Sequence, residues 1–218
     1  MATRANHPKR LLVEGQDDKH SVIHLMRARI PEWPQGEEKA QVWVDIGYGA
    51  EQILKAGFLT ARLKESRLEA LGVVLDADEH APGRYQRVRE LCHRLHPDLP
   101  EQLRPEGVVV ENSDRQRFGV WIMPDNVSPG TLEVFLHYLV PQERQPLWNL
   151  ACSAVQTARS QGAPVRECHE PKANLYTWLA WQDEPGYSPG IALTRRILDP
   201  GAAYADAFVA WFRELYRI

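Results

Sequence analysis

The sequence predicts an α/β protein: a mainly parallel β-sheet flanked by helices, continued by a C-terminal helical extension. Short apolar runs of strand length alternate with segments of helical periodicity up to about residue 125. After Pro124 the apolar residues follow a helical spacing only. We therefore divide the 218 residues into an α/β domain, 1–125, and a helical extension, 126–218, that packs on the sheet.

The first domain is expected to follow the order β-α-β-α-β-α-β-β. Runs rich in Val, Leu and Ile predict strands at 10–14, 41–46, 71–75, 108–111 and 119–123. Apolar residues at helical spacing predict helices that begin at Asp17 or Asp18 and end near Ile30, at 51–65 and at 85–95. The alternation favours parallel strands, and a turn at 114–117 makes the last two strands an antiparallel pair.

The second half of the chain is predicted to be helical. Helical periodicity marks the segments 131–139, 148–159, 172–182, 195–198 and 204–216. The chain has seven tryptophans, and Trp178, Trp181 and Trp211 are among those that lie in these segments. Packing in the core explains this aromatic surface better than a platform for stacking nucleic-acid bases.

The composition is typical of a globular protein, with 44% hydrophobic and 25% charged residues. A formal net charge of -3 argues against electrostatic coating of DNA, although a nuclease can bind its substrate through a local patch and a bound metal. Cys92, Cys152 and Cys168 are widely spaced, which favours reduced thiols. The sequence contains no recognisable signal peptide or transmembrane segment, so we expect a cytoplasmic protein without a membrane partner.

Carboxylates follow two of the predicted strands. Asp76 and Asp78 come directly after the apolar run that ends at Leu75, and their i, i+2 spacing aims both at one point if the backbone stays extended. Glu14, followed by Gly15, ends the first strand in the same way. Parallel strands would bring these oxygens to the carboxyl edge of the sheet, where α/β proteins bind ligands. Oxygen ligands of this kind suit Mg²⁺ or Mn²⁺.

This arrangement resembles the Toprim domain, which is shared by topoisomerases, bacterial primases and the overcoming-lysogenisation-defect (OLD) nucleases. Glu14-Gly15 and the segment 76–78, Asp-Ala-Asp, carry the resemblance, which covers residues 8 to 125 in order and spacing. Within the group, the chain is most similar to small stand-alone bacterial Toprim proteins of unknown function near the OLD-type nucleases. The resemblance implies a Toprim-like fold and metal-dependent cleavage of phosphodiester bonds.

Three further positions match the OLD-type pattern. Asp18 follows Glu14 by four residues, Glu133 resembles the later acidic position, and Lys172 resembles the lysine that contacts the scissile phosphate. The resemblance implies two metal ions. We assign Glu14, Asp76 and Asp78 to the first and Asp18 and Glu133 to the second.

Two of these residues are also assigned catalytic roles. Glu14 is an alternative general acid or base, if neighbouring carboxylates raise its pKa, and metal occupancy would oppose that rise. Lys172 would offset the charge on the pentacovalent phosphorus.

Each candidate also has a purely structural explanation. Asp18 could only cap a helix, Glu133 could only stabilise a helix dipole, and Lys172 could be an ordinary exposed lysine. Asp125 and Glu79 are better explained as turn and helix-start residues, and Glu111 is a reserve ligand. A zinc site is disfavoured, because the candidate cysteine and histidine ligands lack the paired spacing of zinc sites. The candidates are His80, Cys92, His93, His96, Cys168 and His169.

Together these observations favour a nuclease that acts on DNA or RNA, and the OLD-type resemblance suggests a role in defence against phage. The chain contains no GxxxxGK[ST] motif, so an ATPase or another activating protein would be a separate partner. A homodimer stays open. The alternative is a non-catalytic Toprim module that binds nucleic acid or a partner, and a primase-type nucleotidyl transferase ranks below both. Asp18 and Glu133 near Asp76 would favour the two-metal nuclease.

Overall fold

A five-stranded, mostly parallel sheet forms the centre of the protein. The computed structural model describes residues 7–34 and 40–218. The strands are β1 (Lys9–Val13), β2 (Trp43–Ile46), β3 (Ala70–Asp76), β4 (Val108–Glu111) and β5 (Arg117–Met123). Their order is β2-β1-β3-β5-β4, and β4 alone among these strands runs antiparallel, against β5. The predicted fold class is confirmed, and the arrangement is consistent with a Toprim-like α/β fold.

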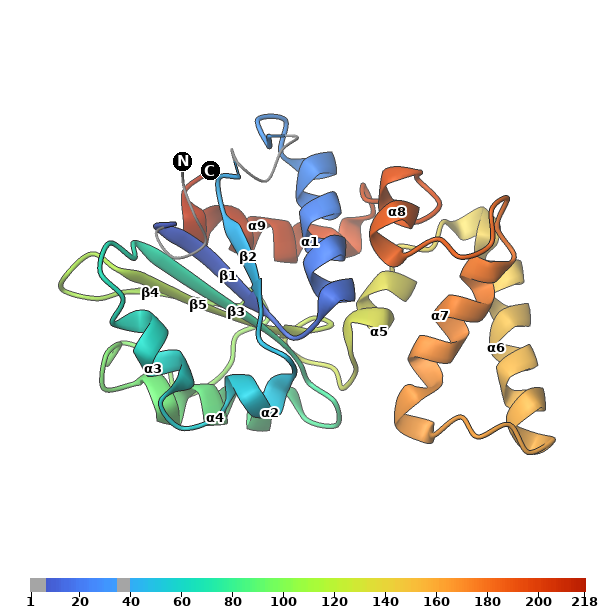
Figure 1. Ribbon diagram of the computed structural model, residues 1–218, viewed down its shortest axis with the longest axis horizontal. Helices are drawn as coiled ribbons and strands as arrows, with labels where there is room; N and C mark the ends of the chain where they lie inside the picture. Colours follow the sequence, from blue (N-terminus) through green and yellow to red (C-terminus); the bar gives the residue numbers. More distant parts are fainter. Residues whose placement is uncertain (1–6, 35–39) are drawn as a thin grey trace.

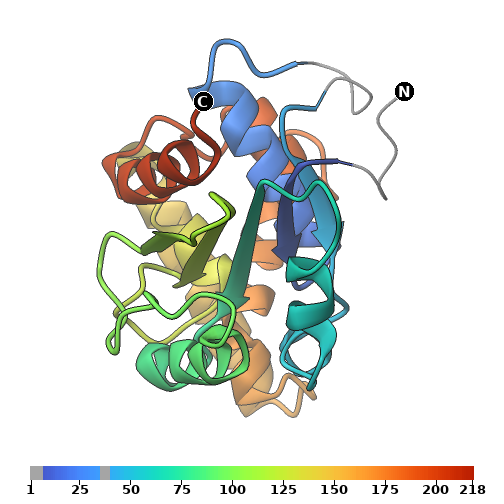
Figure 2. The same cartoon turned by 90° about the vertical axis from the view of Figure 1, so that its left-hand side faces the viewer.

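Helices cover both faces of the sheet (Figures 1 and 2). One face carries α1 (Gln16–Arg29) and α9 (Asp206–Tyr216), and the other carries α2 (Ala50–Ile53), α3 (Phe58–Leu63) and α4 (Ala81–Cys92). The side chains of β1 alternate accordingly. Leu11 and Val13 belong to the apolar cluster that contains α1 and α9, and Leu12 belongs to the cluster that contains α4. Burial on both faces explains why the strands are continuously apolar.

The helical extension begins with α5 (Leu132–His137) and continues through α6 (Gln145–Ser160), α7 (Glu170–Ala180) and α8 (Pro189–Thr194). Figure 1 shows α6 and α7 side by side, beyond the end of the sheet. The chain then returns through α9 to the sheet, where Tyr216 Oη donates a hydrogen bond to the carbonyl of Arg10 (2.6 Å). Within the described ranges, no helix has both the length and the apolar character needed to cross a bilayer.

Two predicted helices are wrong in extent. The predicted helix 51–65 is two short helices, because Gly57 adopts a left-handed φ of 86° between α2 and α3. The predicted helix 195–198 is a turn, and the helix lies earlier, at α8. Ser188 caps α8 and Pro189 occupies its first position. A serine followed by proline is a start signal that the apolar spacing alone did not reveal.

The aromatic residues of the extension are mostly core residues, as predicted. Trp178 and Trp211 are buried, and Trp211 Nε1 donates to the carbonyl of Val108 (3.0 Å). Trp181 differs, since 41% of its surface is exposed. The packing of Trp211 ties the last helix to β4 and stabilises the extension against the sheet.

Candidate functional site

Glu14 lies at the carboxyl edge of the sheet, directly after β1. Its carboxylate accepts a hydrogen bond from the backbone N–H of Asp76 (2.8 Å) and another from that of Ala50 (2.9 Å). β1 and β3 are parallel neighbours, so the residues at their ends meet as predicted. Burial raises the pKa of Glu14 above its ordinary value, against the effect of the two N–H donors.

Asp18 lies in the first turn of α1 and turns back toward Glu14. Its Oδ2 accepts a hydrogen bond from the backbone N–H of Gly15 (3.0 Å), so it does cap the helix. Only 9% of the residue is exposed. Burial, followed by the charges of Glu14 and Glu133, raises the pKa of Asp18 to about 7. Asp18 is therefore both a capping residue and part of a group of interacting carboxylates.

Asp76, the last residue of β3, connects the sheet to the helical extension. Its Oδ1 accepts a hydrogen bond from the backbone N–H of Leu132 (2.8 Å), at the start of α5. Burial raises the pKa of Asp76 well above its ordinary value, and the charges of Asp18, Glu14 and Glu133 raise it further. We call these four residues, Glu14, Asp18, Asp76 and Glu133, the carboxylate cluster.

Asp78 is oriented differently from Asp76. β3 ends at Asp76, and Asp78 has a left-handed φ of 53°. Its backbone exchanges two hydrogen bonds with Gly130 (3.0 and 2.8 Å), and its side chain forms an ion pair with Arg84 of α4. The expectation that both aspartates aim at one point fails here, because the i, i+2 rule holds only while the backbone stays extended. Its charge still adds to the raised pKa of Glu14.

Lys172 brings a cation from α7 to the outer side of the carboxylate cluster. Its Nζ lies 3.6 Å from Glu133 Oε1 and 3.1 Å from Asp17 Oδ2. Burial lowers the pKa of Lys172, but the hydrogen bond to Asp17 and the charge of Glu133 outweigh that effect and the pKa is raised. Tyr176 Oη donates to the same oxygen of Asp17 (2.8 Å). Asp17 and Tyr176 thus position Lys172. The sequence reasoning did not predict this role for either residue.

The reserve candidates lie elsewhere. Asp125 accepts hydrogen bonds from the N–H groups of Val127 (3.0 Å) and Ser128 (2.6 Å), as expected for a turn residue. Glu111 lies at the opposite edge of the sheet, because β4 is antiparallel, and pairs there with Arg217 (2.6 Å). Glu111 is therefore too remote to serve as a ligand beside Asp76.

A groove lies between α4 and the start of α7, and Asp78 and Thr131 contribute to its lining. Its lining includes His80, Arg84 and Arg87 on one side and Cys168 and Pro171 on the other. The sequence reasoning did not single out Arg84 and Arg87. Their i, i+3 spacing on the helix after the Asp-Ala-Asp segment places them on one helical face, and this was the available signal.

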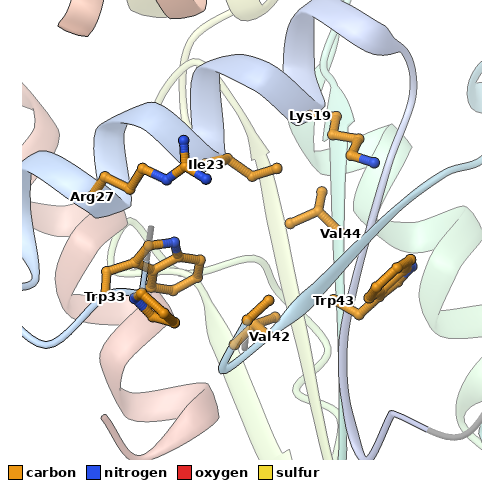
Figure 3. Close-up of a pocket in the computed structure, with 9 residues that line it drawn as sticks. Lys19, Ile23, Arg27, Trp33, Val42, Trp43 and Val44 are labelled. Carbon is orange, nitrogen blue, oxygen red and sulfur yellow. The ribbon is translucent and has the colours of Figure 1, made fainter. Parts of the chain in front are cut away.

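A second hollow lies between α1 and β2 and is separate from the cluster. Figure 3 shows Ile23 of α1 on one side of it, Val42 and Trp43 at the start of β2 on the other, and Trp33 from the loop after α1. No carboxylate is among the residues described as lining it. Within the described residues, this hollow therefore offers no carboxylate ligand for a metal.

The carboxylate cluster has the right donor chemistry for a hard divalent cation. Its side chains offer only oxygen atoms, and burial, followed by the charges of neighbouring carboxylates, raises the pKa values of Asp18 and Asp76. Over residues 7–34 and 40–218, however, no three His, Cys, Asp or Glu side chains are arranged to hold one metal ion. A cation would therefore have to draw the carboxylates closer together.

Comparison with known proteins shows the family. The chain belongs to the family described as "Protein of unknown function (DUF3226)", whose model matches residues 8–217. The match spans both the sheet and the helical extension. No curated protein and no solved structure matched the sequence.

Proposed function

We propose that this protein is a Toprim-type nuclease that hydrolyses phosphodiester bonds of DNA or RNA with the help of Mg²⁺ or Mn²⁺. The observation that carries the proposal is the carboxylate cluster. Four acidic side chains from the ends of two strands and the first turns of two helices interact at one edge of the sheet. Carboxylates whose pKa values are raised by burial and by charged neighbours are common at functional sites, because such an arrangement costs stability.

The ligand assignment follows the positions of the acids. Glu14, Asp76 and Asp78 would hold one ion, and Asp18 and Glu133 would help to hold a second. The charges of Asp18 and Glu133 both raise the pKa of Asp76, so all three act on one region, which supports two-metal chemistry over a binding module. When bound, the ions supply positive charge beside the attacking and leaving oxygens. Asp78 would have to exchange its partner Arg84 for the metal.

Two residues would act on the substrate itself. Lys172 is half exposed, and its ammonium would offset negative charge on the phosphate once substrate displaces it from Asp17 and Glu133. Glu14 remains an alternative general acid or base, because burial raises its pKa above that of an exposed glutamate and so favours its protonated form.

The test is a cleavage assay with supercoiled plasmid, single-stranded DNA and single-stranded RNA, each with Mn²⁺ or with EDTA. Asp76→Asn removes the charge but can keep the oxygen that accepts the Leu132 N–H. Asp183→Asn makes the same chemical change at an exposed residue outside the cluster. We expect Mn²⁺-dependent cleavage that Asp76→Asn reduces at least about 100-fold and Asp183→Asn leaves unchanged. Cleavage that survives in Asp76→Asn would refute the assignment.

The second candidate is a non-catalytic Toprim module that binds nucleic acid or a partner protein. One observation favours it. Both oxygens of Glu14 already accept backbone hydrogen bonds, so the glutamate also has a purely architectural role in joining β1 to β3 and α2. Pure, folded protein that binds nucleic acid but cleaves none of the three substrates with either metal would favour this module over the nuclease.

A further inference from the structure

A second polar cleft lies at the opposite edge of the sheet, where β3 and β5 begin. Its lining includes Arg67, Glu69, Asp114, Arg115, Arg117 and Arg217. We call it the basal cleft. Ala70 pairs with Arg117 at this edge and Asp76 ends β3 at the other, so six residues of strand, roughly 20 Å, separate the basal cleft from the carboxylate cluster.

Positive charge is concentrated around the basal cleft although the chain as a whole is acidic. Arg117 is only 6% exposed, and within the described residues its guanidinium donates one long hydrogen bond, to the carbonyl of Glu214 (3.4 Å). Burial and the neighbouring Arg217 lower the pKa of Arg117. Burial, and then Arg117, lower that of Lys9. These cations therefore repel one another and favour a bound anion.

Acidic residues only partly balance this charge. Glu111 pairs with Arg217 (2.6 Å), and Glu69 and Asp114 also line or border the basal cleft. Four arginines, Arg67, Arg115, Arg117 and Arg217, thus line the basal cleft together with two carboxylates, Glu69 and Asp114. The remaining positive charge is large enough to attract a phosphate group and too local to coat a polymer.

Arg67 and Arg115 are the two residues whose side chains are available to a ligand. Both are exposed, and within the described residues neither side chain forms an ion pair or hydrogen bond. Both also have left-handed backbone conformations, with φ of 71° and 61°. Glycine or asparagine would adopt that conformation at lower cost. Arginine at both positions therefore offers charge to the cleft at the expense of backbone stability.

We propose that the basal cleft binds a phosphate group that carries two or more negative charges, with Arg67 and Arg115 as its main contacts and Arg117 and Arg217 behind them. Guanidinium groups hold phosphate oxygens through paired N–H donors, and several around one cleft favour a dianion over a monoanion. The phosphate has two sources, a free nucleotide or diphosphate and the terminal phosphate of a nucleic-acid strand. This proposal does not depend on catalysis at the carboxylate cluster.

The experiment is a calorimetric titration of the whole protein with inorganic pyrophosphate in EDTA, which prevents any binding through metal at the carboxylate cluster. The test variant is Arg67→Gly/Arg115→Gly. The control is Arg196→Gly, because Arg196 is exposed and has a similar left-handed φ of 57° outside the basal cleft. We expect the double variant to bind pyrophosphate at least ten times more weakly and the control to bind as the wild type does.

A second readout separates binding from a merely structural role. Glycine adopts the left-handed conformation without the steric cost that arginine has there. The melting temperature of the double variant should therefore be no lower than that of the wild type, even though binding is lost. If the glycine variant does not fold, Arg67→Asn/Arg115→Asn gives the same comparison, since asparagine also tolerates this conformation. Binding that stays within twofold of the wild type in either folded variant would overturn the proposal.

The source of the phosphate is tested with two oligothymidylates that differ only in a 5′-phosphate. Tighter binding of the phosphorylated strand, lost in the double variant, assigns the basal cleft to a strand end. Equal binding of the two strands, together with binding of pyrophosphate, assigns it to a free diphosphate or nucleotide. Failure of the wild type to bind either pyrophosphate or the phosphorylated strand at millimolar concentration would overturn the proposal.

Discussion

Asp18→Asn is predicted to stabilise the metal-free protein, and to do so more strongly as the pH rises. The folded state raises the pKa of Asp18 from 3.8 to about 7, chiefly by burial. Well below pH 3.8 the carboxyl is neutral in both the folded and the unfolded chain, and it contributes nothing to the pH dependence. As the pH rises toward 7 the unfolded chain ionises more readily, so the free energy of unfolding falls. Asparagine cannot ionise and avoids this loss.

The size of the effect follows from the pKa. Each pH unit between the two pKa values is worth about 1.4 kcal/mol, so the complete loss is on the order of 4 kcal/mol above pH 7. About 3 kcal/mol of it falls between pH 5 and pH 8. Asparagine can still accept the Gly15 N–H hydrogen bond, so little is lost at low pH. Removing the charge of Asp18 also removes its repulsion of the Asp76 carboxylate, and this further raises the free energy of unfolding of the variant.

The assay is urea unfolding in EDTA at pH 5 and pH 8, with wild type, Asp18→Asn and the exposed control Asp183→Asn. We expect the difference in unfolding free energy between Asp18→Asn and wild type to grow by about 3 kcal/mol between the two pH values. The control should follow the wild type. A difference that is equal at both pH values would show that Asp18 titrates normally, and the argument for a strained carboxylate cluster would fail.

Two further predictions concern the neighbours of the cluster and the packing beneath the sheet. Arg84→Gln removes the cation that pairs with Asp78, so Mn²⁺ should bind several-fold more tightly at pH 8. The affinity is measured by electron paramagnetic resonance titration. An unchanged affinity would mean that Arg84 does not compete with the metal. Gly72→Ala would place a Cβ 2.5 Å from Tyr216 Oη and 2.7 Å from Leu11 Cδ1. This overpacking should lower the free energy of unfolding, measured in urea, by about 1–3 kcal/mol. A variant as stable as the wild type would show that α9 can shift freely on the sheet.

The parts of the site that the sequence predicts are those set by regular backbone. Glu14 follows β1 and Asp76 ends β3, and because these strands are parallel neighbours the two residues could be placed together from the strand pattern and the parallel order. Asp18 was predictable from its position one turn into a helix that begins directly after Gly15. In each case a local rule and the topology agree.

The parts that escaped prediction depend on single backbone angles or on distant segments. Asp78 turns to Arg84 because of its left-handed φ, which nothing in an Asp-Ala-Asp segment reveals. Gly57 breaks a helix that apolar spacing alone would continue. Arg67 and Arg115 lie 48 residues apart in the sequence. They line the same cleft because β3 and β5 start side by side, and hydrophobic periodicity does not specify that pairing.

The hydrogen bond between Asp76 and the N–H of Leu132 has a consequence for how the protein can be divided. Glu133 and Lys172 come from the helical extension, and Asp76 relies on that extension for a hydrogen-bond partner. A fragment cut after residue 125 would therefore lose two charges and expose the glycine-lined sheet face that α9 covers. Sheet and extension form one electrostatic unit. Any partner that tilts α7 against α5 would change the distance between Lys172 and Glu133, and with it the affinity of the carboxylates for a cation.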